Sequence, residues 1–95
     1  MISFIVRLKF APEDRAMMAE TVRQLAAESR HEEGCITYIP HQQQENPDLV
    51  VIYEQYRDEQ ALTAHRESEH FRKYAVSGLY QKMLERTVEV LSALL

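Results

Sequence analysis

The chain opens with a regular alternation of apolar and polar positions. Every even position from 2 to 10 is apolar, whereas Arg7 and Lys9 stand at odd positions. Successive side chains of a β-strand point to opposite faces, so a period of two predicts a half-buried strand over residues 2–10. The apolar face of this strand consists of Ile2, Phe4, Val6, Leu8 and Phe10.

The next apolar residues recur with the spacing of a helix. Pro12 suits a first helical turn, where its missing N–H needs no partner, and Gly34 is a typical helix terminator. The sequence therefore predicts an amphipathic helix between these two residues. Its apolar stripe contains Met18, Val22 and Leu25.

Two more strands are predicted over residues 35–43 and 49–57. The residues between them, 45–48, read Glu-Asn-Pro-Asp, which is turn chemistry and favours a hairpin-like connection.

A second helical region follows and is predicted in two parts. Asp58 is a good N-cap for the first part, and Ser68 is a good N-cap for a shorter helix that starts at Glu69. Gly78 is expected to break this region. Residues 86–94, rich in Val, Leu and Thr, are predicted to form the final strand.

The resulting order is β-α-β-β-α-β, an α+β fold of ferredoxin-like arrangement in one domain, residues 1–95. It has an antiparallel sheet with helices on one face. The first strand and residues 49–53 are more apolar than one covered face requires. Because an exposed apolar face is usually an interface, and a chain this short buries little surface alone, we expect a homodimer joined sheet to sheet.

Composition narrows the function classes. Apolar residues make up 45% and charged residues 27% of the chain, which is globular composition, and the net charge of −4 argues against nucleic-acid binding. One cysteine excludes an internal disulfide, and two glycines cannot build a dinucleotide or phosphate loop. No signal peptide or membrane-length apolar run is visible, so we expect a cytoplasmic protein. Because the chain has only two glycines, we also expect no bound flavin or nicotinamide.

His65 is the strongest candidate for chemistry. It shares a predicted helix face with Ala61 and Leu62, so its ring should point between helix and sheet. Histidine exchanges a proton readily near neutral pH, although a buried histidine bound to a backbone carbonyl is the alternative. His70 lies five residues on, a rotation of about 140° on a helix, so the two rings are not expected to share a face and no metal site is predicted.

Other candidates lie on the two central strands. Glu54 and Tyr56 share a strand face with Ile52 and should enter a cavity near His65, unless Glu54 is simply paired with a cation such as Arg57. Tyr38 and His41 fall on opposite faces of their strand unless a bulge intervenes. Cys35 is interpreted as a buried core residue.

Together these residues form an ordered signature. Glu33 to Tyr38 reads E-G-C-x-x-Y, Glu54 to His65 reads E-x-Y-x-D-x-x-A-L-x-x-H, and His70-Phe71 follows. This signature resembles the antibiotic biosynthesis monooxygenase family, whose small proteins pair as dimeric α/β barrels. Many members carry tryptophan where Tyr56 stands, and a tyrosine here is similar to members that process small phosphorylated or carbonyl-bearing metabolites.

The resemblance implies a cofactor-independent monooxygenase that oxidises a quinol- or polyphenol-like substrate with dioxygen. His65, Tyr56 and Glu54 would be the catalytic residues. An isomerase acting on a carbonyl or phosphorylated metabolite and a non-catalytic ligand-binding dimer are the alternatives. The expected substrate-binding residues are Tyr38, His41, Ile52, Leu62, Phe71 and Met83.

Overall fold

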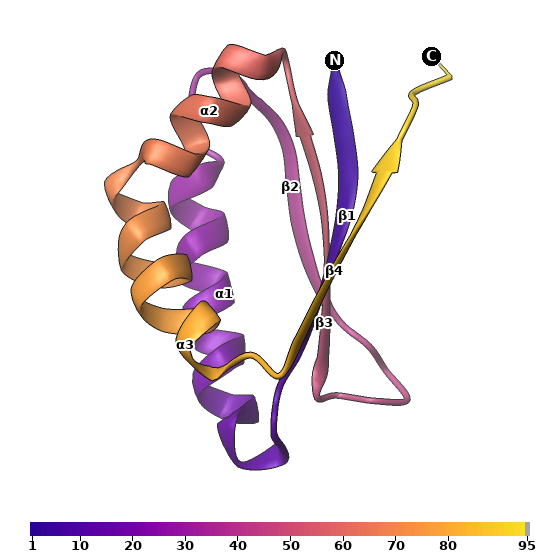
Figure 1. Ribbon diagram of the computed structural model, residues 1–95, viewed down its shortest axis with the longest axis vertical. Coiled ribbons are helices and arrows are strands. Elements are labelled where there is room, and N and C mark those ends of the chain that lie inside the picture. Colours follow the sequence, from indigo (N-terminus) through magenta and orange to yellow (C-terminus); the bar gives the residue numbers. More distant parts are fainter. Residues whose placement is uncertain (95) are drawn as a thin grey trace.

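Strands and helices follow one another in the predicted order. The computed structural model describes residues 1–94, which form a four-stranded antiparallel sheet with helices on one face, and this confirms the ferredoxin-like α+β fold (Figure 1). The strands are β1 (Ile2–Lys9), β2 (Cys35–Gln42), β3 (Leu49–Tyr56) and β4 (Glu85–Leu91). The helical segments are η1 (Pro12–Asp14), α1 (Arg15–Ser29), α2 (Glu59–Glu67), η2 (Phe71–Leu79) and α3 (Tyr80–Lys82).

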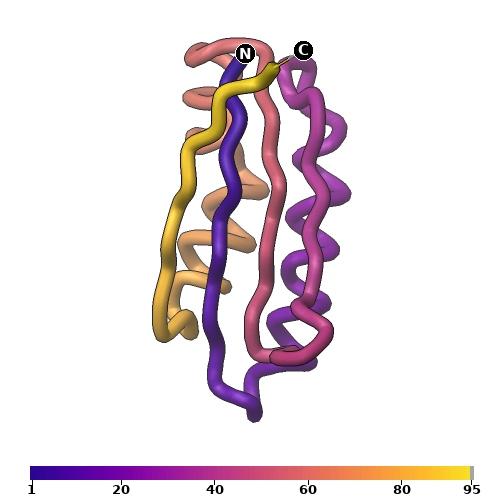
Figure 2. Tube along the Cα trace, turned by 90° about the vertical axis from the view of Figure 1, so that its right-hand side faces the viewer, coloured from indigo at the N-terminus to yellow at the C-terminus, as the bar shows by residue number. Residues whose placement is uncertain are grey.

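The strand order across the sheet is β2-β3-β1-β4 (Figure 2). β1 and β3 pair antiparallel from Ile2 opposite Tyr56 to Lys9 opposite Leu49. β2 carries an irregularity between Cys35 and Thr37, which shifts its register against β3. The order leaves β2 and β4 as the two edge strands.

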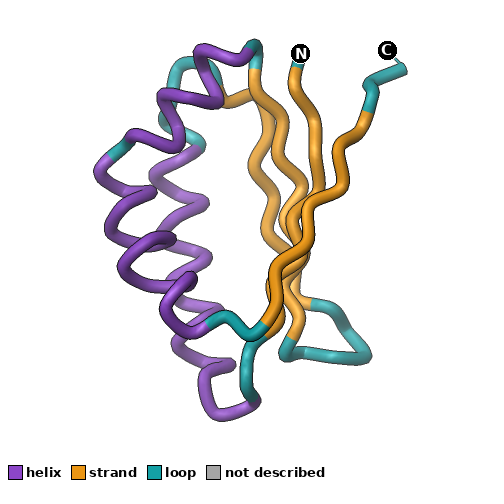
Figure 3. The backbone as a smooth tube through the Cα atoms, in the orientation of Figure 1, coloured by secondary structure: helices purple, strands orange, loops and turns teal. Residues whose placement is uncertain are grey.

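The core lies between the sheet and the helices, which all cover the same face (Figure 3). Even-numbered residues of β1 and β3 point into it, and they meet the predicted stripe of α1. The alternation in the sequence therefore corresponds to an inner and an outer sheet face. Central members of this core are Phe4, Val6, Leu8, Met18, Val22, Leu25, Val50, Ile52, Leu62 and Leu79.

The two predicted caps of the second helical region are confirmed. The Asp58 carboxylate accepts a hydrogen bond from the Ala61 N–H at 2.8 Å. The Ser68 hydroxyl oxygen accepts one from the Phe71 N–H at 3.2 Å, and the same hydroxyl donates to the His65 carbonyl at 2.7 Å. Ser68 therefore ends one helix and starts the next, which turns the chain between His65 and His70.

The predicted roles of both glycines are wrong. α1 ends at Ser29, and no residue in 1–94 has the positive φ of a glycine terminator. Gly34 is instead required by packing, because a Cβ there would lie 2.3 Å from the Ala61 Cβ. Gly78 does not break the helix, since η2 runs through it to Leu79 where the segment packs against α1.

β4 differs from the other strands in its exposure. It spans residues 85–91, shorter than the predicted 86–94 at its C-terminal end, and nearly all of its residues are exposed. Val90 lies opposite Phe4 and Val88 opposite Val6, so both valines are on the face that the helices cover elsewhere. Val90 is nonetheless 79% exposed, which shows that the helices do not extend over β4.

Among the described residues, the helices are too short or too polar to cross a lipid bilayer.

Candidate active site

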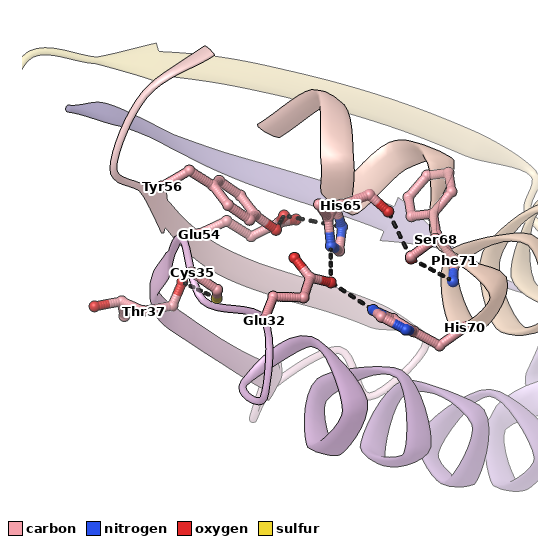
Figure 4. Close-up of polar contacts among 9 residues, drawn as sticks. All are labelled: Glu32, Cys35, Thr37, Glu54, Tyr56, His65, Ser68, His70 and Phe71. Carbon is pink, nitrogen blue, oxygen red and sulfur yellow. Dashed lines mark hydrogen bonds and ion pairs between the residues drawn. The ribbon is translucent and has the colours of Figure 1, made fainter. Parts of the chain in front are cut away.

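A cluster of ionisable side chains lies between the sheet and the α2–η2 junction. Its members come from four separate places: the loop after α1, strand β3, helix α2 and the restart of the helix beyond Ser68 (Figure 4). The residues are Glu32, Glu54, Tyr56, His65 and His70.

Glu54 and Tyr56 share the inner face of β3, as the alternation predicts. The Tyr56 hydroxyl donates to the Glu54 Oε1 at 2.7 Å, and the Tyr56 side chain is completely buried. Burial raises the pKa of Glu54 against the opposing effects of the Tyr56 hydrogen bond and of His65. Burial and the Glu54 charge raise the pKa of Tyr56, so its hydroxyl keeps its proton and remains a donor.

His65 points inward from α2 and has a carboxylate near each ring nitrogen. Its side chain is 3% exposed. Nδ1 lies 2.8 Å from Glu32 Oε2, and Nε2 lies 3.8 Å from Glu54 Oε1. Since an ionised carboxylate only accepts, Nδ1 carries the hydrogen in this arrangement, and the lone pair of a neutral ring is at Nε2.

Glu32 joins the two histidines. The same Oε2 atom that contacts His65 also contacts Nε2 of His70. Burial alone would raise the pKa of Glu32, but hydrogen bonds and charges from both histidines outweigh it and lower the pKa. The expectation that the two rings diverge is wrong, because it assumed one continuous helix, whereas the chain turns at Ser68.

A cavity of about 60 Å³ opens beside this cluster. Its wall is mostly apolar, with the Phe71 ring packed edge-on against His65 at a centroid distance of 5.1 Å. Arg66 and Arg86 are exposed residues that also line the cavity, so its opening carries positive charge. Its lining includes Phe4, Val6, Tyr38, Ile52, Glu54, Leu62, His65, Arg66, Phe71, Tyr80 and Arg86.

The structure brings six of the nine predicted site residues to this cavity. These are Tyr38, Ile52, Glu54, Leu62, His65 and Phe71.

The other three predicted residues lie elsewhere. Tyr56 is outside the cavity lining, where its hydroxyl donates to Glu54 and its ring packs against His65 at a centroid distance of 5.1 Å. His41 is exposed near the end of β2 and lines a separate depression with Met18 and Pro40. Met83 is half-buried at the start of the connection to β4, outside the cavity lining.

Cys35 has the environment of an inert thiol. Burial, together with the negative charges of Glu32 and Glu54, raises the pKa of Cys35 to about 11. The reactive form of cysteine is the thiolate, so this residue is a poor nucleophile at neutral pH.

Sequence reasoning missed Glu32, Arg66 and Arg86. The Ser68 cap was a usable signal that the chain turns between the two histidines, but it does not identify Glu32 as the acceptor they share. No sequence signal distinguishes Arg66 and Arg86 from the other charged surface residues. Arg86 reaches the cavity because β4 pairs with β1, which places it opposite Leu8, and Arg66 reaches it from α2.

Comparison with known proteins agrees with this geometry. The sequence profile described as "Antibiotic biosynthesis monooxygenase" matches residues 1–76. The chain therefore belongs to the antibiotic biosynthesis monooxygenase family. No protein of curated function matches it.

Solved structures share the whole fold. PA3566 from Pseudomonas aeruginosa is 30% identical with a TM-score of 0.91, over 99% of this chain and 94% of that one. Rv0793 from Mycobacterium tuberculosis is 26% identical with a TM-score of 0.87, over 98% and 94%. A crystal structure described as an antibiotic biosynthesis monooxygenase is 25% identical with a TM-score of 0.91, over 99% of both chains.

Proposed function

We propose that this protein is a cofactor-independent monooxygenase that oxidises a small, electron-rich phenolic substrate such as a quinol. One observation carries the proposal. Glu32 accepts the Nδ1 hydrogen of His65, so the lone pair of the neutral ring is at Nε2, on the side of Glu54 and the cavity. A buried imidazole oriented by a carboxylate is a suitable general base.

The chemistry needs only a base, a shielded cavity and dioxygen. His65 Nε2 removes a phenolic proton, and the resulting anion is a much better electron donor. Electrons pass from the anion to dioxygen; one oxygen atom enters the product as a carbonyl and the other leaves as water. The substrate is thereby oxidised by four electrons and loses two hydrogens, so no external reductant is required.

Neighbouring residues have supporting roles in this proposal. Arg66 and Arg86 stabilise the phenolate, since both guanidinium groups remain charged and line the cavity. Tyr38 and Glu54 contact the substrate, with Phe71, Leu62 and Ile52 as the apolar wall. Tyr56 is a positioning residue that fixes Glu54 by its hydrogen bond. The small cavity favours a single aromatic ring over a polycyclic substrate.

The two arginines also support a second candidate. Guanidinium groups bind phosphate well, so an isomerase that moves a proton in a phosphorylated carbonyl metabolite fits the same cavity. His65 would again accept the proton, and Glu54, whose pKa is raised by burial, would return one. A ligand-binding module without catalysis is the third possibility.

We also propose that two chains pair through the outer sheet face and β4. Ile39, Tyr53 and Ile5 are neighbours in one row across the face opposite the helices, and Ile39 is 41% exposed. On the other face, Val88 and Val90 of β4 are exposed apolar residues, at 44% and 79%. A second copy covering these residues would remove apolar surface from water.

The direct test is a substrate screen with an oxygen electrode. Purified protein is mixed with single-ring quinols, polyphenols and phosphorylated carbonyl metabolites, and products are analysed by mass spectrometry under ¹⁸O₂. The proposal predicts oxygen uptake and one ¹⁸O atom per product molecule with a phenolic substrate. Turnover of a phosphorylated metabolite without oxygen uptake would establish the isomerase instead. Saturable binding with no turnover across the panel would identify a binding module.

A further inference from the structure

We propose that Glu32, His65 and His70 form a binding site for a divalent cation, with Zn²⁺ as the ion that the donor set fits best. The site lies on the Nδ1 side of His65, turned away from the contact with Glu54 (Figure 4). It therefore uses the other ring nitrogen from the one proposed as the base, and it lies at the α2–η2 junction.

Three potential ligand atoms converge at this point. Glu32 Oε2, His65 Nδ1 and His70 Nε2 lie within 4.8 Å of one another. They come from three distinct segments: the loop after α1, helix α2 and the helical restart after Ser68. A cation at their centre would therefore tie the loop after α1 to the α2–η2 junction, 33 residues further along the chain.

The donor chemistry matches zinc. Two imidazole nitrogens and one carboxylate are a common three-residue zinc set, in which a water molecule takes the fourth position. In the absence of a cation, the Glu32 carboxylate oxygen accepts hydrogen bonds from both imidazoles, so all three donor groups already point to one place. The side chains of His65, Glu32 and His70 are 3%, 15% and 18% exposed, so the site is enclosed but reachable from the His70 side.

The geometry needs only a small adjustment. Zinc bonds of about 2.0–2.2 Å in a tetrahedron hold ligand atoms roughly 3.4 Å apart. His65 Nδ1 and Glu32 Oε2 are 2.8 Å apart, so they must separate by about 0.6 Å. His70 Nε2 lies closer still to Glu32 Oε2 and must move farther, and rotation of these side chains can supply both movements.

A second observation concerns the other oxygen of the Glu32 carboxylate. Within residues 1–94, Glu32 Oε1 is a buried atom without a hydrogen-bond partner. Hydrogen bonds from the two histidines satisfy Oε2 alone, and a buried carboxylate oxygen without a partner is costly. A cation held by Glu32 would offset this cost, since its charge acts on both oxygens of the carboxylate.

Cation binding at this site would change the proposed reaction, an inference that rests on the proposed function. When the Nδ1 lone pair binds a cation, a neutral His65 ring must carry its hydrogen at Nε2. Nε2 can then donate a proton but cannot accept one. Zinc should therefore inhibit phenol deprotonation, and a chelator should restore it.

The test measures Zn²⁺ binding directly. Protein dialysed against EDTA is titrated with ZnCl₂ by isothermal calorimetry, for the wild type and for the His70→Ala, Glu32→Gln and His41→Ala variants. We expect one Zn²⁺ per chain in the wild type, at least tenfold weaker binding in the first two variants, and unchanged binding in His41→Ala. His41 is the matched control because it is an exposed histidine outside the cluster. The proposed site would be overturned if the wild type did not bind Zn²⁺, or if His70→Ala bound it as tightly as the wild type.

Two further measurements make the test independent of variant folding and of activity. In wild-type protein, Zn²⁺ should shift the imidazole NMR signals of His65 and His70 while leaving those of His31 and His41 in place. Zn²⁺ should also raise the melting temperature of the wild type. These readouts need no substrate, so the two proposals can fail separately. Zinc binding without monooxygenase activity would reject the proposed function alone. Monooxygenase activity without zinc binding would reject the cation site alone.

Discussion

Gly34 and Ala61 hold the loop before β2 against the first turn of α2, and replacing Gly34 with alanine should destabilise the fold. A Cβ on Gly34 would lie 2.3 Å from the Ala61 Cβ and 3.3 Å from the Ala61 Cα. Non-bonded carbon atoms are stable at about 3.5–4.0 Å, so the two backbones must separate by roughly 1.2 Å. The hydrogen bond from the Arg57 N–H to the Gly34 carbonyl, at 2.9 Å, resists this movement.

The expected cost follows from overpacking of a close contact. Insertion of one methyl group into a tightly packed site costs about 1–3 kcal/mol, and we expect about 2 kcal/mol for Gly34→Ala. For a domain of this size that corresponds to a fall in melting temperature of roughly 8–16 °C. Ala61→Gly alone should cost about 1 kcal/mol through helix propensity.

A double-mutant cycle identifies the cause. In Gly34→Ala with Ala61→Gly, the clashing Cβ of residue 61 is gone and only the 3.3 Å contact remains. The double variant should therefore be more stable than the sum of the single variants by about 1–2 kcal/mol. Urea unfolding followed by circular dichroism measures all four proteins. Additive effects would refute the packing explanation, as would a neutral Gly34→Ala.

Two other predictions concern the buried carboxylate and the dimer. Tyr56→Phe removes the hydroxyl that donates to Glu54 and should cost about 1–3 kcal/mol in urea unfolding, because a buried acceptor loses its partner. Tyr53→Phe, on the outer face, is the control, and an equal loss in both variants would contradict this account. Sedimentation at micromolar concentration should show a species of twice 11.2 kDa, and Val90→Lys should shift it toward monomer. A wild-type monomer there would reject the dimer.

Much of the fold was predictable because it depends on local patterns. The alternation in β1 and β3 specifies which residues point inward, and the Asp58 and Ser68 caps specify where two helices begin. The glycine predictions failed for a physical reason. Gly34 and Gly78 were interpreted by backbone propensity. Gly34 is instead required by the nearby Ala61, and the helix continues through Gly78.

The site was predictable only where one element carries it. Glu54 and Tyr56 are two residues apart on one strand, so their contact follows from the strand period. Glu32 is 33 residues from His65 and meets it only because the loop after α1 ends beside α2. The position of Arg86 depends in the same way on the register of β4 against β1, which no pattern within either strand encodes.

The central claim is that His65 is the base that starts oxidation of a phenolic substrate. The decisive measurement is kcat/KM for oxygen uptake, on a substrate found in the screen, for the wild type, His65→Ala and the exposed-histidine control His31→Ala. Loss of a general base should lower kcat/KM by about 10²–10⁴-fold in His65→Ala, with circular dichroism showing a folded protein, while His31→Ala keeps the wild-type rate. A folded His65→Ala variant with near wild-type kcat/KM would show that His65 is a structural histidine and would contradict the mechanism.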